Sequence, residues 1–385
     1  MDDYDITPIG VTNWRNQNKS FGIKDKDRLG HIYCIGKTGM GKSTLLQQMA
    51  LSDITKGKGC GIIDPHGDVA KYLIARIPEE RKKDLVYINP TEENVIAFNP
   101  LHAIHPNYHH LVTSGLISTF KKIWAESWGP RLEYILRFSL LTLLQYPYAT
   151  LLDIQLLLTD QQFREKVLEY VKDDYIFDFW RKEFDKYSPS FRNEVISPIL
   201  NKVGIFVSSK PLKKMLGQQT SSFRMSQVMD ESKILIANLS KGSIGEDTAT
   251  IIGSILVTSI QLSALFRAKQ EQNKRISFYL YVDEAHSFLS LSFADILAEA
   301  RKYGLSLFLA HQYIEQLHED IRSAIFGNVG TLICFRVGAT DAEYLEKEFE
   351  QIFDRNDLIN LPKFGICLKV MIDGVTSHPF SGISV

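Results

Sequence analysis

The chain has 385 residues and is 44% hydrophobic, so it can form two or three domains with sizeable cores. With 44 Lys and Arg against 45 Asp and Glu, its formal net charge of −1 excludes a protein that is basic overall, and any contact with nucleic acid must be local. The four cysteines lie singly inside apolar runs without Cys-x-x-Cys spacing, which predicts reduced core thiols and argues against disulfide bonds and a cysteine metal site.

The first informative element is a phosphate-binding loop. An apolar, strand-like run at 31–35 precedes the octet GKTGMGKS at 36–43, which has the pattern G-x-x-x-x-G-K-[ST], and 44–51 reads as a helix. This order of strand, loop and helix lets backbone N–H groups point at phosphates. The alternative is a glycine turn without a ligand. The predicted nucleotide-binding residues are Gly36, Lys37, Thr38, Gly39, Met40, Gly41, Lys42, Ser43 and Thr44.

The last residues of this loop indicate its cofactors. Lys42 would reach the β and γ oxygens of a nucleoside triphosphate as a point charge. The Ser43 hydroxyl would ligate the Mg²⁺ that bridges these phosphates. ATP and Mg²⁺ are therefore the expected cofactors.

Strands continue to alternate with helices up to about residue 105, with strand-like runs at 60–64 and 85–89. Asp64, at the end of the first of these runs, would either support the magnesium shell or the loop lysine, or begin a tight turn. For His66 and Asp68 the turn is the favoured interpretation.

From 108 to about 215 the pattern changes to long amphipathic helical periods with scarcely a strand signal. This predicts an all-α inserted domain over 106–216. It leaves 1–105 together with 217–385 as the nucleotide-binding domain.

Two groups of side chains in this insert invite a functional interpretation. Aromatic and basic residues interleave at 120–124 and 179–182, as in a surface that stacks on DNA, although such helices more often bury their aromatics. Four histidines flank Pro106 without neighbouring Cys or carboxylates, so we interpret them as surface residues and not as a metal site. They are His102, His105, His109 and His110.

Strand signals resume at 234–237 and continue to 366–372. The run 276–282 is apolar apart from one serine and stops at Asp283 and Glu284, as expected of a buried parallel strand that delivers carboxylates. Asp283 suits the outer shell of the magnesium, and Glu284 suits a general base for the attacking water. The alternative is an acidic turn after a core strand.

The next segment supplies a polar strand end. Residues 292–303 read as a helix closed by Gly304, and the strand 305–310 ends so that Gln312 lies at the carboxyl edge of the sheet. There Gln312 would sense the γ phosphate or position water, or it is an ordinary exposed side chain. The apolar stretch 251–266 carries several Ser, Thr and Gln residues, so we expect a buried helix and not a membrane span.

Taken together, these motifs resemble those of the type IV secretion coupling proteins, the conjugative DNA-transfer ATPases of the FtsK/HerA group of RecA-like motors. The resemblance covers essentially the whole chain. It is carried by 36–43, 64–68, 99–101, 234–240, 281–284, 299–305, 310–312 and 335–338.

The resemblance implies a fold, a reaction and partners. The fold is an α/β RecA-like P-loop NTPase domain with a mostly parallel central sheet flanked by helices, plus an all-α insert. Members of the family form hexameric rings that hydrolyse ATP and move DNA through a central channel, which implies DNA, further copies of the chain and components of a type IV secretion or DNA-processing apparatus as partners.

The same resemblance implies an arginine that reaches the ATP of the neighbouring subunit. The matching residue here is Arg301, and Arg336 is a second candidate. Such an arginine neutralises charge on the γ oxygens in the transition state. The alternative for Arg301 is a cation that favours the dipole at the end of a helix.

One feature departs from the family. Coupling proteins typically carry membrane helices ahead of the motor, whereas here the P-loop begins at residue 36 after an acidic start that is no signal peptide. The expectation is a soluble relative, or a form without the anchored part. It is expected in the cytoplasm or peripherally at the inner face of the membrane, with no integral membrane segment.

The sequence therefore predicts an Mg²⁺-dependent ATPase that acts as a DNA-translocating ring motor. Its predicted catalytic residues are Lys42, Glu284, Gln312 and Arg301, and its metal-site residues are Ser43 and Asp283. The alternatives are an ATPase that moves protein in a secretion or assembly system, a HerA-like DNA-processing helicase or translocase, and a nucleotide-gated interaction module that does not hydrolyse ATP.

Overall fold

The computed structural model describes residues 5–13 and 18–384, and the chain divides into two compact units. The sheet unit consists of Met1–Ile88, Met225–Ser240 and Ser263–Val385, and the helical unit consists of Asn89–Arg224 and Lys241–Leu262. The helical unit therefore includes a second segment, 241–262, which the sequence pattern places in the nucleotide-binding domain.

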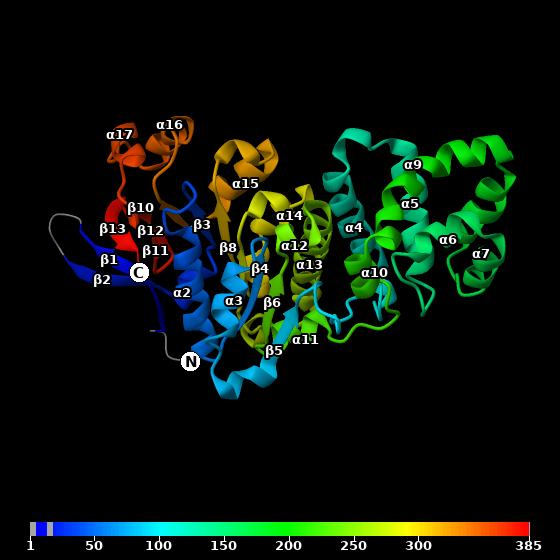
Figure 1. Cartoon of the computed structure of the whole chain (residues 1–385), viewed down its shortest axis with the longest axis horizontal. Helices are drawn as coiled ribbons and strands as arrows, with labels where there is room; N and C mark the ends of the chain where they lie inside the picture. The colour runs from blue at the N-terminus through cyan, green and yellow to red at the C-terminus, as the bar shows by residue number, and fades with distance from the viewer. Residues whose placement is uncertain (1–4, 14–17, 385) are drawn as a thin grey trace. The chain divides into compact units, whose positions relative to one another are not determined.

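The sheet unit is built on an eleven-stranded mixed sheet in the order β2-β1-β13-β10-β9-β3-β8-β7-β4-β6-β5 (Figure 1). The run from β9 to β5 is parallel, and we call it the parallel half. Its strands are β3 (Ile32–Ile35), β4 (Gly59–Asp64), β5 (Leu85–Ile88), β6 (Ile234–Asn238), β7 (Phe278–Val282), β8 (Leu305–His311) and β9 (Thr331–Cys334).

The remaining strands pair antiparallel, and we call them the antiparallel half. They are β1 (Ile6–Thr12), β2 (Lys19–Lys24), β10 (Gly365–Lys369) and β13 (Phe380–Ser384), and a separate hairpin is formed by β11 (Met371–Ile372) and β12 (Val375–Thr376). The mostly parallel sheet confirms the predicted fold class.

Burial explains which strands the sequence predicts. The strands β3, β4, β6, β7, β8 and β9 are buried along their whole length, so their sequences are almost continuously apolar. By contrast, β1 and β2 contain Pro, Gly and exposed polar positions. Their strand signal is correspondingly weak, and the sequence pattern does not predict them.

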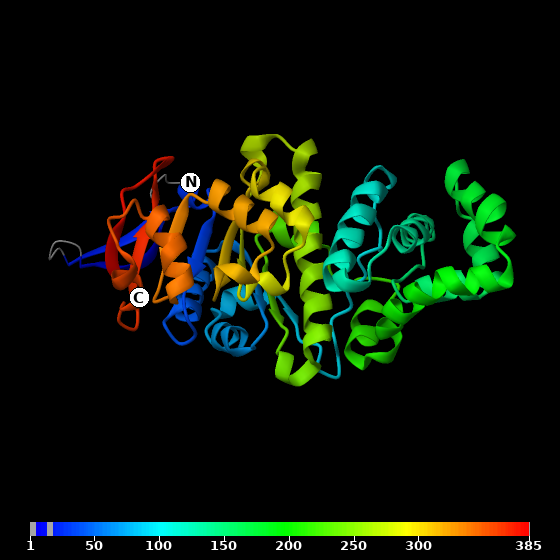
Figure 2. The ribbon, with the colours of Figure 1, turned by 90° about the horizontal axis from the view of Figure 1, so that it is seen from above.

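Helices cover both faces of the sheet. α2 (Lys42–Thr55) and α3 (Asp68–Ile74) lie on one face, where they share a buried cluster with alternate strand residues such as Ile32 and Cys34 (Figures 1 and 2). Tyr33 points to the other face, where its ring lies 5.4 Å from that of Phe326 in α15 (Glu319–Asn328). The remaining α-helices are α1 (Asp25–Arg28), α11 (Met225–Asp230), α14 (Leu291–Leu297), α16 (Ala339–Glu348) and α17 (Arg355–Ile359).

The predicted helix over 292–303 is two pieces in the structure. α14 is followed by a separate 3₁₀ turn, Ala300–Tyr303. Gly304 then adopts φ 71°, a left-handed conformation that glycine takes at no steric cost and that ends the helical segment.

The helical unit contains α4 (His109–Ile123), α5 (Pro130–Leu143), α6 (Asp153–Thr159), α7 (Gln161–Leu168), α8 (Asp174–Asp178), α9 (Pro189–Ser208), α10 (Lys210–Leu216), α12 (Lys241–Ile244) and most of α13 (Glu246–Phe266). Three of the four aromatics in the two basic-aromatic segments, Phe120, Phe179 and Trp180, are buried in it, while Trp124 is half-buried. The Trp180 indole N–H donates to Thr142 Oγ1 at 2.8 Å. The three buried rings are core residues and are not available to stack on DNA.

One helical segment, Glu246–Lys269, is long and apolar enough to cross a membrane. In the structure 78% of its most apolar window is buried, as in the core helix of a folded domain. By length and composition alone it is weak evidence for a membrane span.

Candidate active site

The carboxyl ends of four neighbouring strands surround one cavity. In the sheet order β3-β8-β7-β4, the P-loop follows β3, Gln312 follows β8, Glu284 follows β7 and His66 follows β4. The cavity has a volume of about 300 Å³. It is lined by Thr38, Gly39, Gly41, Lys42, Ser43, Thr44, His66, Asp283, Glu284, Gln312, Lys363 and Phe364. Parallel sheets bind ligands at this edge.

Two glycines give the P-loop its path. Gly39 and Gly41 have φ values of 78° and 127°, which residues with a side chain rarely adopt. A Cβ atom at Gly41 would also lie 2.7 Å from the Phe364 ring and 2.8 Å from the Phe335 ring. The loop leads directly into α2, whose first N–H groups have no partner within a helix, as in an anion-binding helix start.

Lys42 places its ammonium group inside this loop. Its Nζ donates to the carbonyl of Gly36 at 2.5 Å and to that of Lys37 at 3.2 Å, and the residue is buried. The charge therefore lies where the backbone N–H groups of the loop would hold phosphates.

Asp283 and Ser43 meet although they are 240 positions apart in the sequence. The Ser43 hydroxyl donates to Asp283 Oδ2 at 3.1 Å. Burial raises the pKa of Asp283, and the nearby carboxylates of Glu284 and Asp64 raise it further. Hydroxyl and carboxylate oxygens are the ligands that Mg²⁺ prefers, so this pair fits the predicted metal.

Within the described part of the chain, no group of three or more His, Cys, Asp or Glu side chains could hold a metal by itself. A nucleotide-bound Mg²⁺ does not need such a group. It takes one or two protein ligands and completes its shell with phosphate oxygens and water.

Glu284 is held in an unusual conformation. Its φ and ψ are both 50°, in the left-handed region that costs a residue other than glycine about 1 kcal/mol or more. Its Oε1 accepts a hydrogen bond from Gln312 Nε2 at 2.5 Å. Burial by itself would raise the pKa of Glu284, but His66, Gln312 and the charge of His286 outweigh it and lower the pKa to about 2.

Three histidines close to this carboxylate were not among the predicted site residues. His66 Nε2 lies 3.9 Å from Glu284 Oε1, and His286 Nδ1 lies 3.5 Å from Oε2. His311 is buried with its ring 5.1 Å from that of His286, and burial and the charge of His286 lower its pKa to about 3. His66 lies two residues after the end of β4, and this position is its only sequence signal. That β4 lies next to β7, and so brings His66 near Glu284, is known only from the strand order.

Asp64 serves the loop that carries His66. Its Oδ1 accepts the backbone N–H of His66, and its Oδ2 accepts that of Ala70, both at 2.9 Å. Both oxygens of this buried carboxylate thus hold the turn, which supports the turn interpretation of this segment.

The two candidate arginines lie at opposite ends of the parallel strands, Arg301 at the amino ends and Arg336 at the carboxyl ends. Arg301 is exposed just before β8 begins. It lies near His31, at the start of β3, where burial and then the charge of Arg301 lower the pKa of the imidazole. Arg336 follows β9 beside the P-loop, where its carbonyl accepts the Lys37 N–H at 2.7 Å. Arg301 therefore lies at the edge away from its own P-loop, and Arg336 lies next to it.

Lys363 and Phe364, which line the cavity, come from the segment before β10 and were not predicted. The N–H of Phe364 donates to the carbonyl of Met40 at 2.9 Å, and the Phe364 ring occupies the space beside Gly41. Nothing in the local sequence marks these residues, because their proximity to the P-loop depends on the position of β10 in the sheet.

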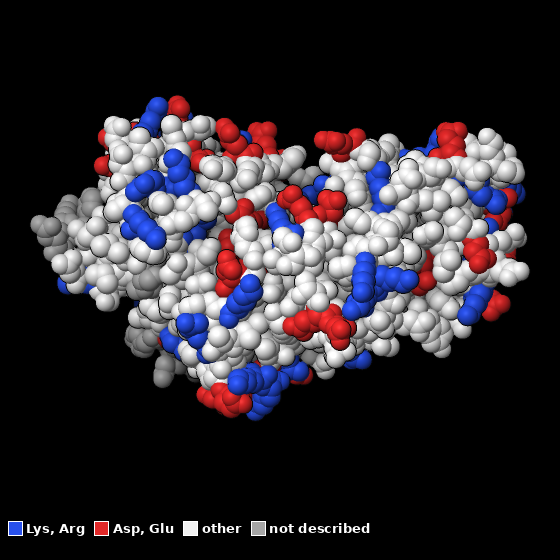
Figure 3. Space-filling model, viewed as in Figure 1, with Lys and Arg blue, Asp and Glu red and all other residues white. Residues whose placement is uncertain are grey.

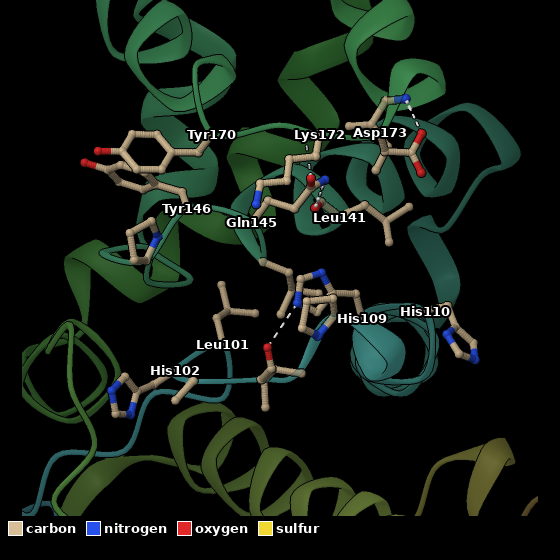
Figure 4. Close-up of a pocket in the computed structure, with 16 residues that line it drawn as sticks. Leu101, His102, His109, His110, Leu141, Gln145, Tyr146, Tyr170, Lys172 and Asp173 are labelled. Carbon is tan, nitrogen blue, oxygen red and sulfur yellow. Dashed lines mark hydrogen bonds between the residues drawn. The ribbon is translucent and has the colours of Figure 1, made fainter.

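A second cavity of about 790 Å³ lies within the helical unit (Figure 4). Figure 4 shows His102, His109 and His110 on its wall, well apart and pointing in different directions. His102 Nδ1 accepts the Ser221 N–H, and His109 Nε2 lies 3.1 Å from the Ile104 carbonyl oxygen. These three histidines do not converge on a common point; His102 and His109 are half-buried, and His110 is exposed.

Comparison with known proteins places this geometry in a family. Residues 21–358 match the sequence model of one protein family, the type IV secretion-system coupling protein DNA-binding domain. No curated protein sequence matches the chain.

Solved structures show the same fold. The unbound monoclinic form of the bacterial conjugative coupling protein TrwBdeltaN70 has a TM-score of 0.67 at 14% identity, covering 99% of this chain and 90% of that one. VirB4 of Thermoanaerobacter pseudethanolicus has a TM-score of 0.65 at 14% identity, covering 100% and 97%. TrwB in complex with ADP and Mg²⁺ has a TM-score of 0.62 at 15% identity, covering 93% and 86%.

Proposed function

The chain belongs to the family of type IV secretion-system coupling protein DNA-binding domains, and on this premise we propose that it is an Mg²⁺-dependent ATPase that moves DNA as a ring-shaped motor. The observation that carries the proposal is the single cavity shared by Lys42, Ser43, Asp283, Glu284 and Gln312. A nucleotide-gated module without hydrolysis would need the P-loop but not the Glu284–Gln312 pair.

The residues divide the work of hydrolysis among them. Lys42 and the N–H groups of the P-loop bind the phosphates, and Ser43 and Asp283 would hold Mg²⁺. When bound, the metal neutralises charge on the phosphate oxygens. Glu284 accepts a proton from the attacking water, and Gln312 orients Glu284 and the water.

A ring supplies what one chain lacks. Because Arg301 lies at the edge of the sheet away from its own P-loop, it would act on the nucleotide of a neighbouring copy. An arginine shared in this way makes turnover depend on assembly. We take a closed ring, a hexamer as in the family, to be the active form.

The proposed cargo is DNA, contacted locally. On the face seen in Figure 3, Lys and Arg are interspersed with Asp and Glu and form no continuous basic stripe. A ring can still concentrate modest local charge around a central channel, because every subunit contributes the same patch. The proposed location is the cytoplasm or the inner face of the membrane.

Two measurements test the proposal. ATP turnover per subunit should rise with protein concentration, and it should rise further with single- or double-stranded DNA. Glu284→Gln should lower kcat by roughly 10³-fold while ATP still binds, because only the proton acceptor is lost. Turnover without any response to DNA would favour a protein-moving ATPase instead.

A further inference from the structure

Glu284 is approached from both sides along the edge of the sheet. It follows β7, whose neighbours in the sheet are β8 and β4. From the β8 side, Gln312 Nε2 donates to Glu284 Oε1. From the β4 side, His66 Nε2 lies 3.9 Å from the same oxygen. Two nitrogen groups from the loops after different strands therefore face one carboxylate oxygen.

The loop that carries His66 is rigidly built. The buried Asp64 carboxylate accepts the backbone N–H groups of His66 and Ala70. Gly67 has φ 87°, and a Cβ atom there would lie 2.7 Å from Asn238 Oδ1. The His66 backbone is thus fixed by contacts that do not involve its imidazole. The imidazole itself is 54% exposed, while the Glu284 side chain is only 10% exposed.

Register explains why these two loops meet. β4 and β7 pair in parallel with Ile63 opposite Val282, and the Asp283 N–H donates to the Ile63 carbonyl at 3.1 Å. The two loops therefore leave the sheet side by side. A half-exposed imidazole on a fixed loop, directed at a nearly buried carboxylate, is more than a turn requires.

We infer that His66 is a positioning residue for ATP hydrolysis, which holds the Glu284 carboxylate from the β4 side while Gln312 holds it from the β8 side. This inference rests on the proposed ATPase function. A general base must present one oxygen at a fixed place within hydrogen-bonding reach of the attacking water. His66 and Gln312 both face Oε1, and His286 Nδ1 lies 3.5 Å from Oε2, so the three groups together restrain the orientation of the carboxylate.

The test compares His66→Ala and His66→Gln in the full chain. Loss of a group that orients a reacting residue should lower kcat for ATP by about tenfold. KM should change by less than about twofold, because His66 is not assigned to nucleotide binding. His66→Gln keeps an N–H donor and should recover most of kcat. His110→Ala, an exposed histidine of the helical unit, is the matched control and should leave turnover unchanged.

A second measurement separates positioning from other roles. In a Glu284→Gln background, His66→Ala should change the residual single-turnover rate by less than about twofold, because its action passes through Glu284. An equal loss in that background would overturn the inference, as would an unchanged kcat in the wild-type background or a loss confined to KM. Absence of ATP turnover in the wild-type protein, with and without DNA, would overturn the proposed function and this inference with it.

Discussion

The parallel and antiparallel halves of the sheet contribute different things to the candidate site. Loops from the parallel half carry the polar groups, namely Lys42, Glu284, Gln312 and His66. The segment before β10, in the antiparallel half, contributes one charged side chain, Lys363, and Phe364, whose N–H and ring fix the P-loop around Gly41. Under the proposed function, the parallel half supplies the residues assigned to hydrolysis, and the antiparallel half keeps the phosphate loop in its conformation.

The largest expected effect lies in the parallel half. Lys42→Ala removes the buried ammonium group that donates to the P-loop carbonyls and should weaken ATP binding by roughly 100-fold and abolish turnover. Fluorescent nucleotide titration and phosphate release measure the two effects. Lys71→Ala, which changes an exposed lysine on α3, is the control. Near-normal ATP affinity in Lys42→Ala would contradict the assignment of this cavity as the nucleotide site.

The next effect tests whether the parallel half is complete in one subunit. Arg301→Ala should lower kcat by about 100-fold or more with little change in ATP binding, because the arginine acts on charge in the transition state. Mixing Arg301→Ala with Lys42→Ala subunits should restore measurable turnover, since each variant supplies what the other lacks at a shared site.

Lys302→Ala is the matched control for Arg301, as its neighbour in the same 3₁₀ turn. Failure of the mixture to regain turnover, while both proteins form rings, would exclude a shared site built on Arg301. Equal turnover in Arg301→Ala and wild type would do the same.

A smaller effect is expected from the antiparallel half. Phe364→Ala removes the ring beside Gly41 and should raise the KM for ATP by about fivefold through a looser P-loop, with a smaller change in kcat. Steady-state kinetics measure both KM and kcat for ATP. If kcat fell and KM did not, Phe364 would have to act on the reaction itself, and the proposed division between the halves would be wrong.

The smallest effect on turnover is expected farther out in the antiparallel half. The rings of Phe21 and Phe380 lie 5.2 Å apart on β2 and β13. Phe21→Ala should lower the free energy of unfolding by about 1–3 kcal/mol and leave the KM for ATP within about twofold. Thermal unfolding with parallel kinetics checks both, and a large KM change would show that this region also shapes the site.

The sequence predicted the parts of the site whose chemistry depends on short local patterns. The P-loop octet and the Asp283-Glu284 strand end are of this kind, because phosphate and metal binding require particular residue types at fixed spacing. The strands that deliver them are apolar because they are buried on both faces. Fold class and family follow from the same short segments.

The remaining site residues depend on strand order, which no local pattern encodes. From the sequence alone, His66 is only a residue of a tight turn, because its proximity to Glu284 depends on β4 lying next to β7. Phe364 is an isolated aromatic until β10 is known to pair with β9. The left-handed conformation of Glu284 is likewise a product of the assembled structure, since glutamate has no local preference for it.

The position of β3 has a consequence for how the protein is made. The strand that leads into the phosphate loop pairs with β8 and β9, so both its partners lie beyond residue 304. During synthesis both edges of this strand remain unpaired until most of the polypeptide has left the ribosome. Such distant pairing slows folding and exposes apolar edges to aggregation. Nascent chains of this protein should therefore depend on protection by chaperones until the later strands emerge.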